Sequence, residues 1–191
     1  MAKLQGESNS YYVHPTAIVE SRAIGEGTKI WHFAHVRKGS KIGKNCNIGK
    51  SVYIDIDAEI GSNVKIQNFV SVYKGVIIED DVFVGPSATF TNDLYPRAFI
   101  WDESHVSATR ICRGASIGAN ATLVCGITVG EYAMIGAGCV VAKDVPPFAL
   151  VLGNPAHQKG YVCYCGHRLK KDATTSVYKC TNCGKSVEIA K

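Results

Sequence analysis

The chain has 191 residues, of which 46% are hydrophobic and 19% are charged, and its formal net charge is +5. This composition is typical of a globular protein, and no apolar run is long enough to cross a bilayer. Residues 1–11 are polar and lack the apolar stretch of a secretory signal, so we expect a cytoplasmic protein without a membrane partner.

The excess positive charge lies in the C-terminal part of the chain. Residues 156–191 hold seven Lys or Arg against two Asp or Glu, whereas residues 1–155 hold 14 of each kind. The seven cations form no basic stripe, and such a set is more often a solvated surface than a nucleic-acid site. We therefore expect no nucleic-acid partner.

An aliphatic residue recurs at every sixth position in two long series. The positions are Ile18, Ile24, Ile30, Val36, Ile42, Ile48, Ile54, Ile60, Ile66, Val72, Ile78 and Val84, and then Ile111, Ile117, Leu123, Val129, Ile135 and Val141. A period of six fits neither one long helix nor one long strand, but it suits a short strand followed by a sharp corner.

Three such hexads close one triangular coil, with the aliphatic side chains stacked inside. Each strand then pairs with the strand one coil away, about 4.8 Å distant, which makes three parallel sheets. Glycine follows the aliphatic residue in many hexads, as at Gly43, and we expect it at the corner, where it permits left-handed backbone geometry. The sequence therefore predicts an all-β parallel β-helix over residues 12–155.

The two series of hexads do not join in phase. Ile111 follows Val84 by 27 residues, which is four hexads plus three residues. We therefore expect an insertion loop over residues 86–110, which holds Asn92-Asp93 and Trp101. A long loop in a regular solenoid is usually functional or forms an interface, and a decorative insertion is the alternative.

Two proline-containing turns, 144–147 and 153–156, end the solenoid, and residues 156–191 form a separate tail. The tail holds two close cysteine pairs, each followed by glycine: Cys163, Cys165, Cys180 and Cys183. This pattern resembles a zinc ribbon, and a segment this short needs a metal to fold, so we expect structural zinc bound by these four cysteines. His167 in place of Cys163 is one alternative, and disulfides are another. The other four cysteines are expected to be small core residues.

Several segments of the β-helix resemble one protein family. They are IWHFAHV (30–36), KIQNFVSVY (65–73), VFVGPSATFTNDLYPRA (82–98) and GAGCVVAKDVPPFALVLGNPA (136–156). Together with the hexads, they resemble the hexapeptide acyltransferases, and among these the nucleotide-sugar N-acetyltransferases that act on UDP-2-acetamido-3-amino-2,3-dideoxyglucuronate.

The resemblance implies a left-handed β-helix that assembles as a homotrimer, with reaction sites between neighbouring prisms. It also implies acetyl-CoA as co-substrate along the C-terminal coils, a nucleotide sugar along the N-terminal coils and a role in surface polysaccharide synthesis. The reaction would be acetyl transfer to a sugar 3-amine.

The same resemblance assigns roles to single residues. Asn92 orients the amine, unless Asn92-Asp93 forms only a turn, and His105 is the alternative general base. The residues expected to bind the nucleotide sugar are Gln67, Asn68, Tyr95 and Arg97. Those expected to bind CoA are Gly118, Gly136, Ala137, Lys143, Asn154 and Pro155. Arg97 would bind a diphosphate or a sugar carboxylate, and a buried ion pair is its alternative.

Three other readings remain open from the sequence. In the first, the substrate is a dTDP-3-amino-3,6-dideoxyhexose, because relatives that use such sugars share much of the pattern. A non-catalytic β-helix scaffold, with the tail as a docking module, is the alternative of another class. A γ-class carbonic anhydrase fits poorly, since His32 and His35 are spaced too closely for its zinc site.

Overall fold

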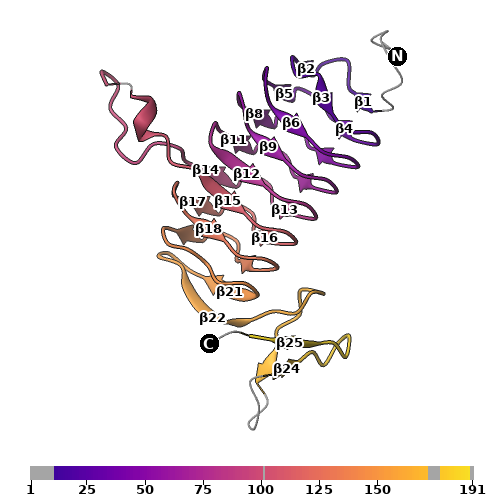
Figure 1. Cartoon of the computed structure of the whole chain (residues 1–191), viewed down its shortest axis with the longest axis vertical. Coiled ribbons are helices and arrows are strands. Elements are labelled where there is room, and N and C mark those ends of the chain that lie inside the picture. Colours follow the sequence, from indigo (N-terminus) through magenta and orange to yellow (C-terminus); the bar gives the residue numbers. More distant parts are fainter. Residues whose placement is uncertain (1–10, 101, 172–176, 190–191) are drawn as a thin grey trace.

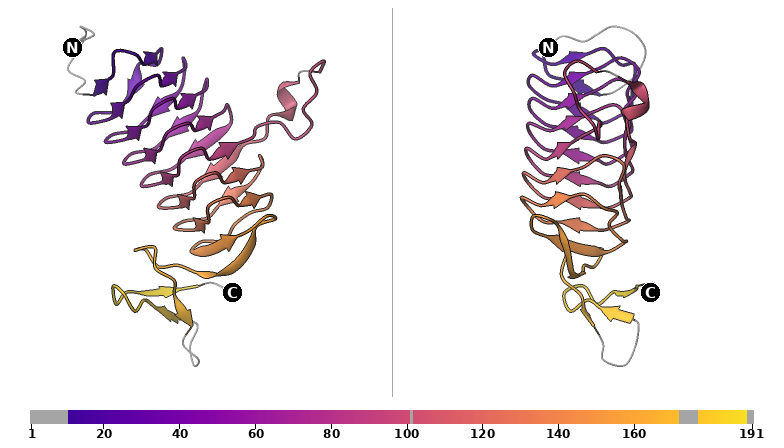
Figure 2. Two further views of the ribbon diagram at one scale, coloured as in Figure 1. Left: turned by 180° about the vertical axis from the view of Figure 1, so that it is seen from behind. Right: turned by 90° about the vertical axis from the view of Figure 1, so that its left-hand side faces the viewer.

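The computed structural model describes residues 11–100, 102–171 and 177–189. Within these ranges the chain forms a long column of short parallel strands, an arm that projects from its side and a small β-sheet at its C-terminal end (Figures 1 and 2). Trp101 and the polar N-terminal residues 1–10 lie outside the described residues. No helix among the described residues has the length and hydropathy that a membrane span requires.

Three sheets form the sides of the column. Sheet A contains β1 (Tyr12–Val13), β4 (Lys29–Ile30), β7 (Asn47–Ile48), β10 (Lys65–Ile66), β13 (Phe83–Val84), β16 (Ser116–Ile117), β19 (Met134–Ile135), β21 (Ala149–Leu152) and the antiparallel β22 (His157–Tyr161). Sheet B contains β2 (Ile18–Val19), β5 (His35–Val36), β8 (Tyr53–Ile54), β11 (Ser71–Val72), β14 (Thr89–Phe90), β17 (Thr122–Leu123) and β20 (Val140–Val141). Sheet C contains β3 (Ala23–Ile24), β6 (Lys41–Ile42), β9 (Glu59–Ile60), β12 (Val76–Ile78), β15 (Thr109–Ile111) and β18 (Thr128–Val129). The predicted parallel β-helix is confirmed.

The aliphatic residues of the hexads fill the inside of the column. Ile30, Ile48 and Ile66 of sheet A stack on one another and are 0% exposed. In the hexads from Ile30 onward, the residue two positions before the aliphatic residue is also buried, and it is usually small. Examples are Ala34, Cys46, Val52, Ala58, Val64, Ala88, Ala115, Ala121, Ala133 and Cys139. The sequence pattern missed this second inward position. The predicted core placement of the single cysteines is confirmed for Cys46, Cys125 and Cys139, whereas Cys112 is only half-buried.

The first hexad deviates from the predicted register. Val19 pairs with Val36, whereas Ile18 pairs with His35 and is 58% exposed. The prediction that Ile18 points inward is therefore wrong by one residue. The reason is that the corner before Ile24 is one residue shorter than the others.

The glycines after the aliphatic residues are needed for a different reason from the one predicted. A Cβ atom on Gly43 would lie 2.5 Å from the carbonyl carbon of Gly61 on the next coil, so close stacking excludes a side chain. The left-handed residue lies two positions later, where Asn45 (φ 55°), Asp57 (φ 56°) and Phe69 (φ 61°) all occupy it. Tight contact between coils, and not backbone conformation, therefore selects the glycines next to the strands.

The insertion begins later than the sequence predicts. β14 still pairs with β11 and β17, and Phe90 takes the inward position at 1% exposed. In sheet C, Ile60 pairs with Ile78 after one regular coil, whereas Ile78 pairs with Ile111 after nearly twice that length of chain. All the added residues therefore belong to one coil. We call residues 92–107, which leave the column between sheets B and C, the arm (Figure 1).

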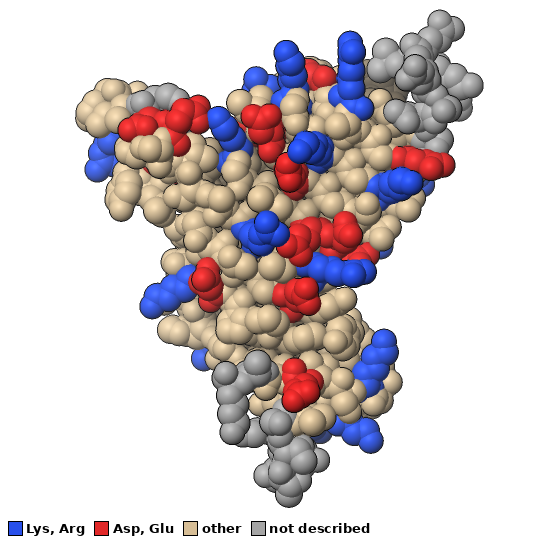
Figure 3. Space-filling model, viewed as in Figure 1, with Lys and Arg blue, Asp and Glu red and all other residues tan. Residues whose placement is uncertain are grey.

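Ion pairs link successive coils on the sheet C side of the column. The Nζ of Lys41 lies 2.8 Å from the Oε1 of Glu59, and the Nη2 of Arg113 lies 3.1 Å from the Oδ2 of Asp81. Figure 3 shows Lys and Arg beside Asp and Glu over this face. This side is a solvated surface with balanced charge, and none of the predicted site residues lies on its strands.

Candidate functional site

The residues predicted for catalysis, sugar binding and CoA binding lie at two corners of the column, one on each edge of sheet B. Residues that directly follow sheet A strands form the A–B corner. They are Gln67 and Asn68 after β10, Gly118 after β16, Gly136 and Ala137 after β19, and Asn154 and Pro155 after β21. The B–C corner holds Asn92 and Lys143, which follow β14 and β20, and the arm. Within one chain, sheet B separates these two groups.

At the A–B corner, coil stacking accounts for much of the predicted set. A Cβ atom on Gly118 would collide with the backbone of Ala137, and one on Gly136 would collide with the side chain of Leu152. The side-chain oxygen of Asn68 accepts a hydrogen bond from the backbone N–H of Lys50 on the preceding coil (2.9 Å). The coils of Asn68 and Gly136 are three steps apart, about 14 Å. A ligand that bridges the predicted sugar and CoA residues would therefore lie along the column.

Two exposed phenylalanines also stand at the A–B corner, and the sequence reasoning missed them. Phe33 is 60% exposed and Phe69 is 57% exposed, and both are in the left-handed conformation that turns the chain. The ammonium group of Lys50 lies 5.6 Å from the ring centre of Phe69. Large apolar rings held open to solvent on a rigid corner provide stacking surfaces for a flat ligand. The spacing of Phe33 and Phe69 along the chain, two full coils, is the signal that indicates their proximity.

At the B–C corner, the base of the arm is a short antiparallel ladder. The N–H of Ser107 donates to the carbonyl of Asn92 (3.0 Å), and Asp93 bridges to Val106. The hydroxyl of Thr91 accepts from the N–H of Cys125 on the next coil (3.0 Å). Asn92 is half-buried, and its backbone is fixed where the arm leaves the column.

An ion pair ties the outer part of the arm to the column. The Nζ of Lys74 lies 2.7 Å from the Oε2 of Glu103, in the 3-10 turn η1 (Glu103–His105). The hydrogen bond from Lys74 to this carboxylate raises the pKa of Lys74 above its usual value. Asp102 caps the turn by accepting from the N–H of Ser104 (2.8 Å), which lowers the pKa of Asp102. Sequence reasoning missed Lys74, although it precedes Asn92 by three hexads, one regular coil.

The remaining predicted residues of the arm are exposed or half-buried. The ring of His105 packs edge-on against Tyr95, with ring centres 5.9 Å apart. The turn proposed as an alternative for Asn92-Asp93 is made by Asp93, whose side chain accepts from the N–H of Tyr95 (2.7 Å). Arg97 is exposed and donates to the carbonyl of Pro96 (2.9 Å), so it makes no buried ion pair within the described part of this chain.

The arm carries a band of exposed apolar side chains. Phe99 is 84% exposed and Tyr95 69%, while Leu94 and Ile100 are 45% and 47% exposed. Four large apolar residues on one projecting segment are unusual for a surface that faces only water. Exposed apolar groups of this kind are typical of contact surfaces.

The four cysteines of the tail come together, as the sequence predicts. Their sulfur atoms all lie within 4.8 Å of one another. The ring nitrogen of His167 lies 3.6 Å from the sulfur of Cys165, but Cys163 itself belongs to the cluster. The backbone N–H of His167 lowers the pKa of Cys165 to about 6. The small sheet of the tail lies at the C-terminal end of the column, away from the arm (Figure 2).

Comparison with known families and proteins identifies the relatives of this fold. Residues 23–55, 57–92 and 108–143 match the family of bacterial transferases with hexapeptide repeats. The chain belongs to this family. Its predicted relationship to the hexapeptide acyltransferases is thereby confirmed.

One relative is similar over nearly its whole length. The dTDP-3-amino-3,6-dideoxy-α-D-galactopyranose 3-N-acetyltransferase of Aneurinibacillus thermoaerophilus is 46% identical over 177 residues, which are 93% of this chain and 92% of the relative. The similarity therefore includes the β-helix, the arm and part of the tail.

Solved structures share the fold. A hexapeptide-repeat acetyltransferase of Vibrio cholerae, solved with acetyl-CoA, has a TM-score of 0.57 and 25% identity, over 64% of this chain and 70% of that chain. A mutant of the GDP-perosamine N-acetyltransferase of Caulobacter crescentus, solved with CoA and GDP-perosamine, has a TM-score of 0.52 and 23% identity, over 80% of this chain and 58% of that chain. The second likeness concerns the fold alone.

Proposed function

We propose that this protein transfers the acetyl group of acetyl-CoA to the 3-amino group of a dTDP-3-amino-3,6-dideoxyhexose. The observation that carries the proposal is the 46% identity to an enzyme with this kind of substrate, over 92% of that enzyme. The sequence favoured a UDP-linked diaminoglucuronate and kept the dTDP sugar as the alternative. The relative supports the alternative, and the UDP sugar becomes the competing substrate in the test. Surface polysaccharide synthesis in the cytoplasm stays the expected setting.

The reaction site in this proposal lies between two copies of the chain in a homotrimer. Sheet B separates the A–B corner, with Gln67 and Gly136, from the B–C corner, with Asn92 and the arm. A second copy beside the first would bring the A–B corner of one chain to the B–C corner of its neighbour. The exposed Phe99 and Ile100 of the arm would then be covered.

The chemical step joins the sugar nitrogen to the acetyl carbonyl carbon. The neutral amine attacks the thioester, a C–N bond forms, the C–S bond breaks, and coenzyme A leaves as a thiolate. The amine proton passes to the thiolate, so products are the N-acetyl sugar and free CoA. A sugar amine flanked by electron-withdrawing oxygens is partly neutral near pH 7, and the protein must chiefly orient the two reactants.

Asn92 is the residue we assign to the amine. Its backbone is fixed by Ser107 at the base of the arm, so its side chain starts from a rigid point at the predicted cleft. An amide oxygen accepts a hydrogen bond from the amine and points the nitrogen lone pair at the thioester. His105 stays the alternative base.

The substrates would lie along the corners of the column. Phe33 and Phe69 supply stacking surfaces for the thymine base, beside Gln67 and Asn68. The dideoxyhexose has no carboxylate, so the diphosphate is the group left for Arg97, with Tyr95 next to it. Acetyl-CoA would follow Gly118, Gly136 and Ala137 toward Asn154 and Pro155 of one chain. Lys143, at the B–C corner of the neighbouring copy, would bind a phosphate. Structural zinc, the other expected cofactor, takes no part in this reaction.

The substrate proposal is tested by offering one nucleotide sugar at a time with acetyl-CoA and following thiol release. The set contains dTDP-3-amino-3,6-dideoxygalactose, its glucose epimer and the UDP-linked diaminoglucuronate. A blank without sugar corrects for the cysteines of the protein. We expect the dTDP sugars to have a kcat/KM at least about tenfold above that of the UDP sugar, and the reverse order would contradict the proposal. If the chain is a scaffold instead, acetyl-CoA will not raise its melting temperature.

The role of Asn92 is tested by two substitutions. Asn92→Ala should lower kcat about 100-fold with little change in the KM for acetyl-CoA. Asn92→Asp keeps an acceptor oxygen, but its negative charge stabilises the ammonium form of the substrate and raises the pKa of the amine. Activity of the Asp variant should therefore recover as pH rises. An unchanged kcat in the Ala variant would exclude the assignment.

A further inference from the structure

The tail contains two chain turns of the same construction. In the first, the N–H of Gly166 donates to the carbonyl of Cys163 (2.8 Å), and the N–H of Cys163 donates to the carbonyl of His167 (2.9 Å). In the second, the N–H of Gly184 donates to the carbonyl of Cys180 (3.0 Å), and the N–H of Cys180 donates to the carbonyl of Lys185 (2.9 Å). Both turns close on a glycine in the left-handed conformation, with φ of 82° and 73°. The second turn contains one residue more, yet both present two sulfur atoms to one point.

The distances between sulfur atoms fit ligands of a common ion. Cys163 and Cys183 are 3.5 Å apart at sulfur, and Cys165 and Cys180 are 3.6 Å apart. Four sulfurs at about 2.3 Å from a tetrahedral zinc ion lie about 3.8 Å from one another. A disulfide requires about 2.05 Å, and all four cysteines are free. The contacts link the first turn to the second, so one ion would hold both.

The tail has little else to hold it together. Among the described residues of the tail, the buried ones are Val162, Cys163, Cys180 and Val187, so two of these four are members of the cluster. A segment with so small a core does not keep its fold by hydrophobic burial. The cysteine cluster therefore lies at the centre of the tail, and it is also the main candidate for what stabilises the fold of the tail.

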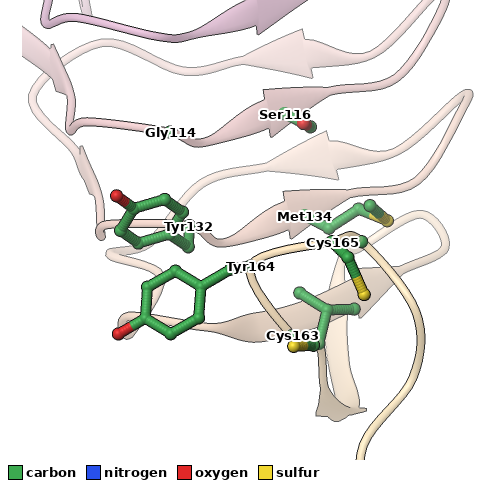
Figure 4. A pocket seen from close by; sticks show the side chains of 9 residues that line it. Gly114, Ser116, Tyr132, Met134, Cys163, Tyr164 and Cys165 are labelled. Carbon is green, nitrogen blue, oxygen red and sulfur yellow. The ribbon is translucent and has the colours of Figure 1, made fainter. Parts of the chain in front are cut away.

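The first turn also forms the contact between the tail and the column. Tyr164, which stands between Cys163 and Cys165, packs edge-on against Tyr132 (ring centres 4.6 Å apart) and Phe148 (4.9 Å). The N–H of Val162 donates to the carbonyl of Phe148 (2.8 Å). Figure 4 shows Tyr164 beside Tyr132 and the two cysteines beside Met134, around a recess of about 300 Å³. The segment that carries the first two sulfurs is thus the same segment that contacts the last coils.

We propose that Cys163, Cys165, Cys180 and Cys183 bind one zinc ion, and that this ion fixes the tail against the last coils of the β-helix. The ion joins the two turns, and the first turn then presents Tyr164 to Tyr132 and Phe148, beside Met134 of β19. Without the ion, the two turns separate and Tyr164 leaves its place on the column. Because four thiolates complete the coordination shell, the site has no open position for a substrate.

Metal content of the purified full-length protein is the first test. We expect one zinc per chain by mass spectrometry of the metal, and a cobalt-substituted protein with the intense thiolate-to-cobalt absorption of a four-sulfur site. Cys183→Ser should lose the zinc, while the control Cys112→Ser, a half-buried cysteine of the column, should keep it. The metal site is refuted if the wild type binds no zinc at micromolar concentration, if its intact mass shows two disulfides, or if Cys183→Ser retains one equivalent.

Docking is tested on the wild type, so that a misfolded variant does not obscure the answer. Hydrogen exchange is compared between zinc-loaded protein and protein stripped with a chelator. We expect amides of residues 149–169 to exchange at least about tenfold faster without zinc, while those of the first coils do not change. Tyr164→Ala should keep its zinc and lose the protection, and Tyr164→Phe should keep both. Zinc binding without any effect on exchange would overturn the docking proposal and leave the proposed acetyl transfer untouched.

Discussion

Replacement of Gly43 by alanine tests why glycine follows so many of the strands. The new Cβ atom would lie 2.5 Å from the carbonyl carbon of Gly61, whereas ordinary contacts begin at 3.4 Å. The two coils must separate locally by the difference, about 0.9 Å. The hydrogen bond from the N–H of Gly43 to the carbonyl of Ile60, now 2.8 Å, would lengthen to about 3.7 Å and be lost.

The cost follows from these distances. A lost backbone hydrogen bond contributes about 1 kcal/mol, and the forced shift of a packed backbone adds about 1–3 kcal/mol. We expect Gly43→Ala to lower the free energy of unfolding by about 2–4 kcal/mol, and thus the melting temperature by about 4–16 °C. Thermal unfolding followed by circular dichroism at one fixed protein concentration measures this change.

Asparagine variants at two glycines separate close stacking from backbone conformation. Gly138 has a φ of 69° and nothing within 4 Å of the position of its Cβ, so Gly138→Asn should be nearly neutral. Asparagine tolerates the left-handed conformation but is larger than alanine. If Gly43 served backbone conformation, Gly43→Asn would be tolerated too. We expect Gly43→Asn to be at least as damaging as Gly43→Ala, and a wild-type melting temperature for it would refute the stacking argument.

Two further substitutions test the arm and the core. Lys74→Met should speed hydrogen exchange in the arm about twofold to fivefold and lower kcat. The melting temperature should change little, because the lost ion pair between Lys74 and Glu103 is partly exposed. Lys41→Met, which removes a similar pair far from the arm, is the control, and equal effects from both variants would exclude a positioning role for Lys74. Leu123→Ala, at a position 0% exposed, should cost about 2–5 kcal/mol, while Leu123→Met should cost under about 1.5 kcal/mol. Equal costs would mean that the site is not packed as described.

Part of the candidate site was readable from the sequence because its signal is local. The Asn92 to Arg97 segment interrupts a regular period and matches a family pattern, and the cysteine pairs are close in the chain. The roles of Lys74, Phe33 and Phe69 were missed because their neighbours lie one or two coils away. The residues that stack on a given position come from other coils. They can be identified in the sequence only by comparing positions that are whole coils apart.

The sequence by itself determined the three-sided column, because burial repeats with every strand and a six-residue period has few other solutions. It also determined that the chain must leave the column once, since the two series are out of phase. Only the tertiary structure decided which residue of the first hexad points inward, that Phe90 continues the core, and that glycine is required where neighbouring coils touch. These outcomes depend on distances between coils, and such distances exist only once the chain has wound around its own core.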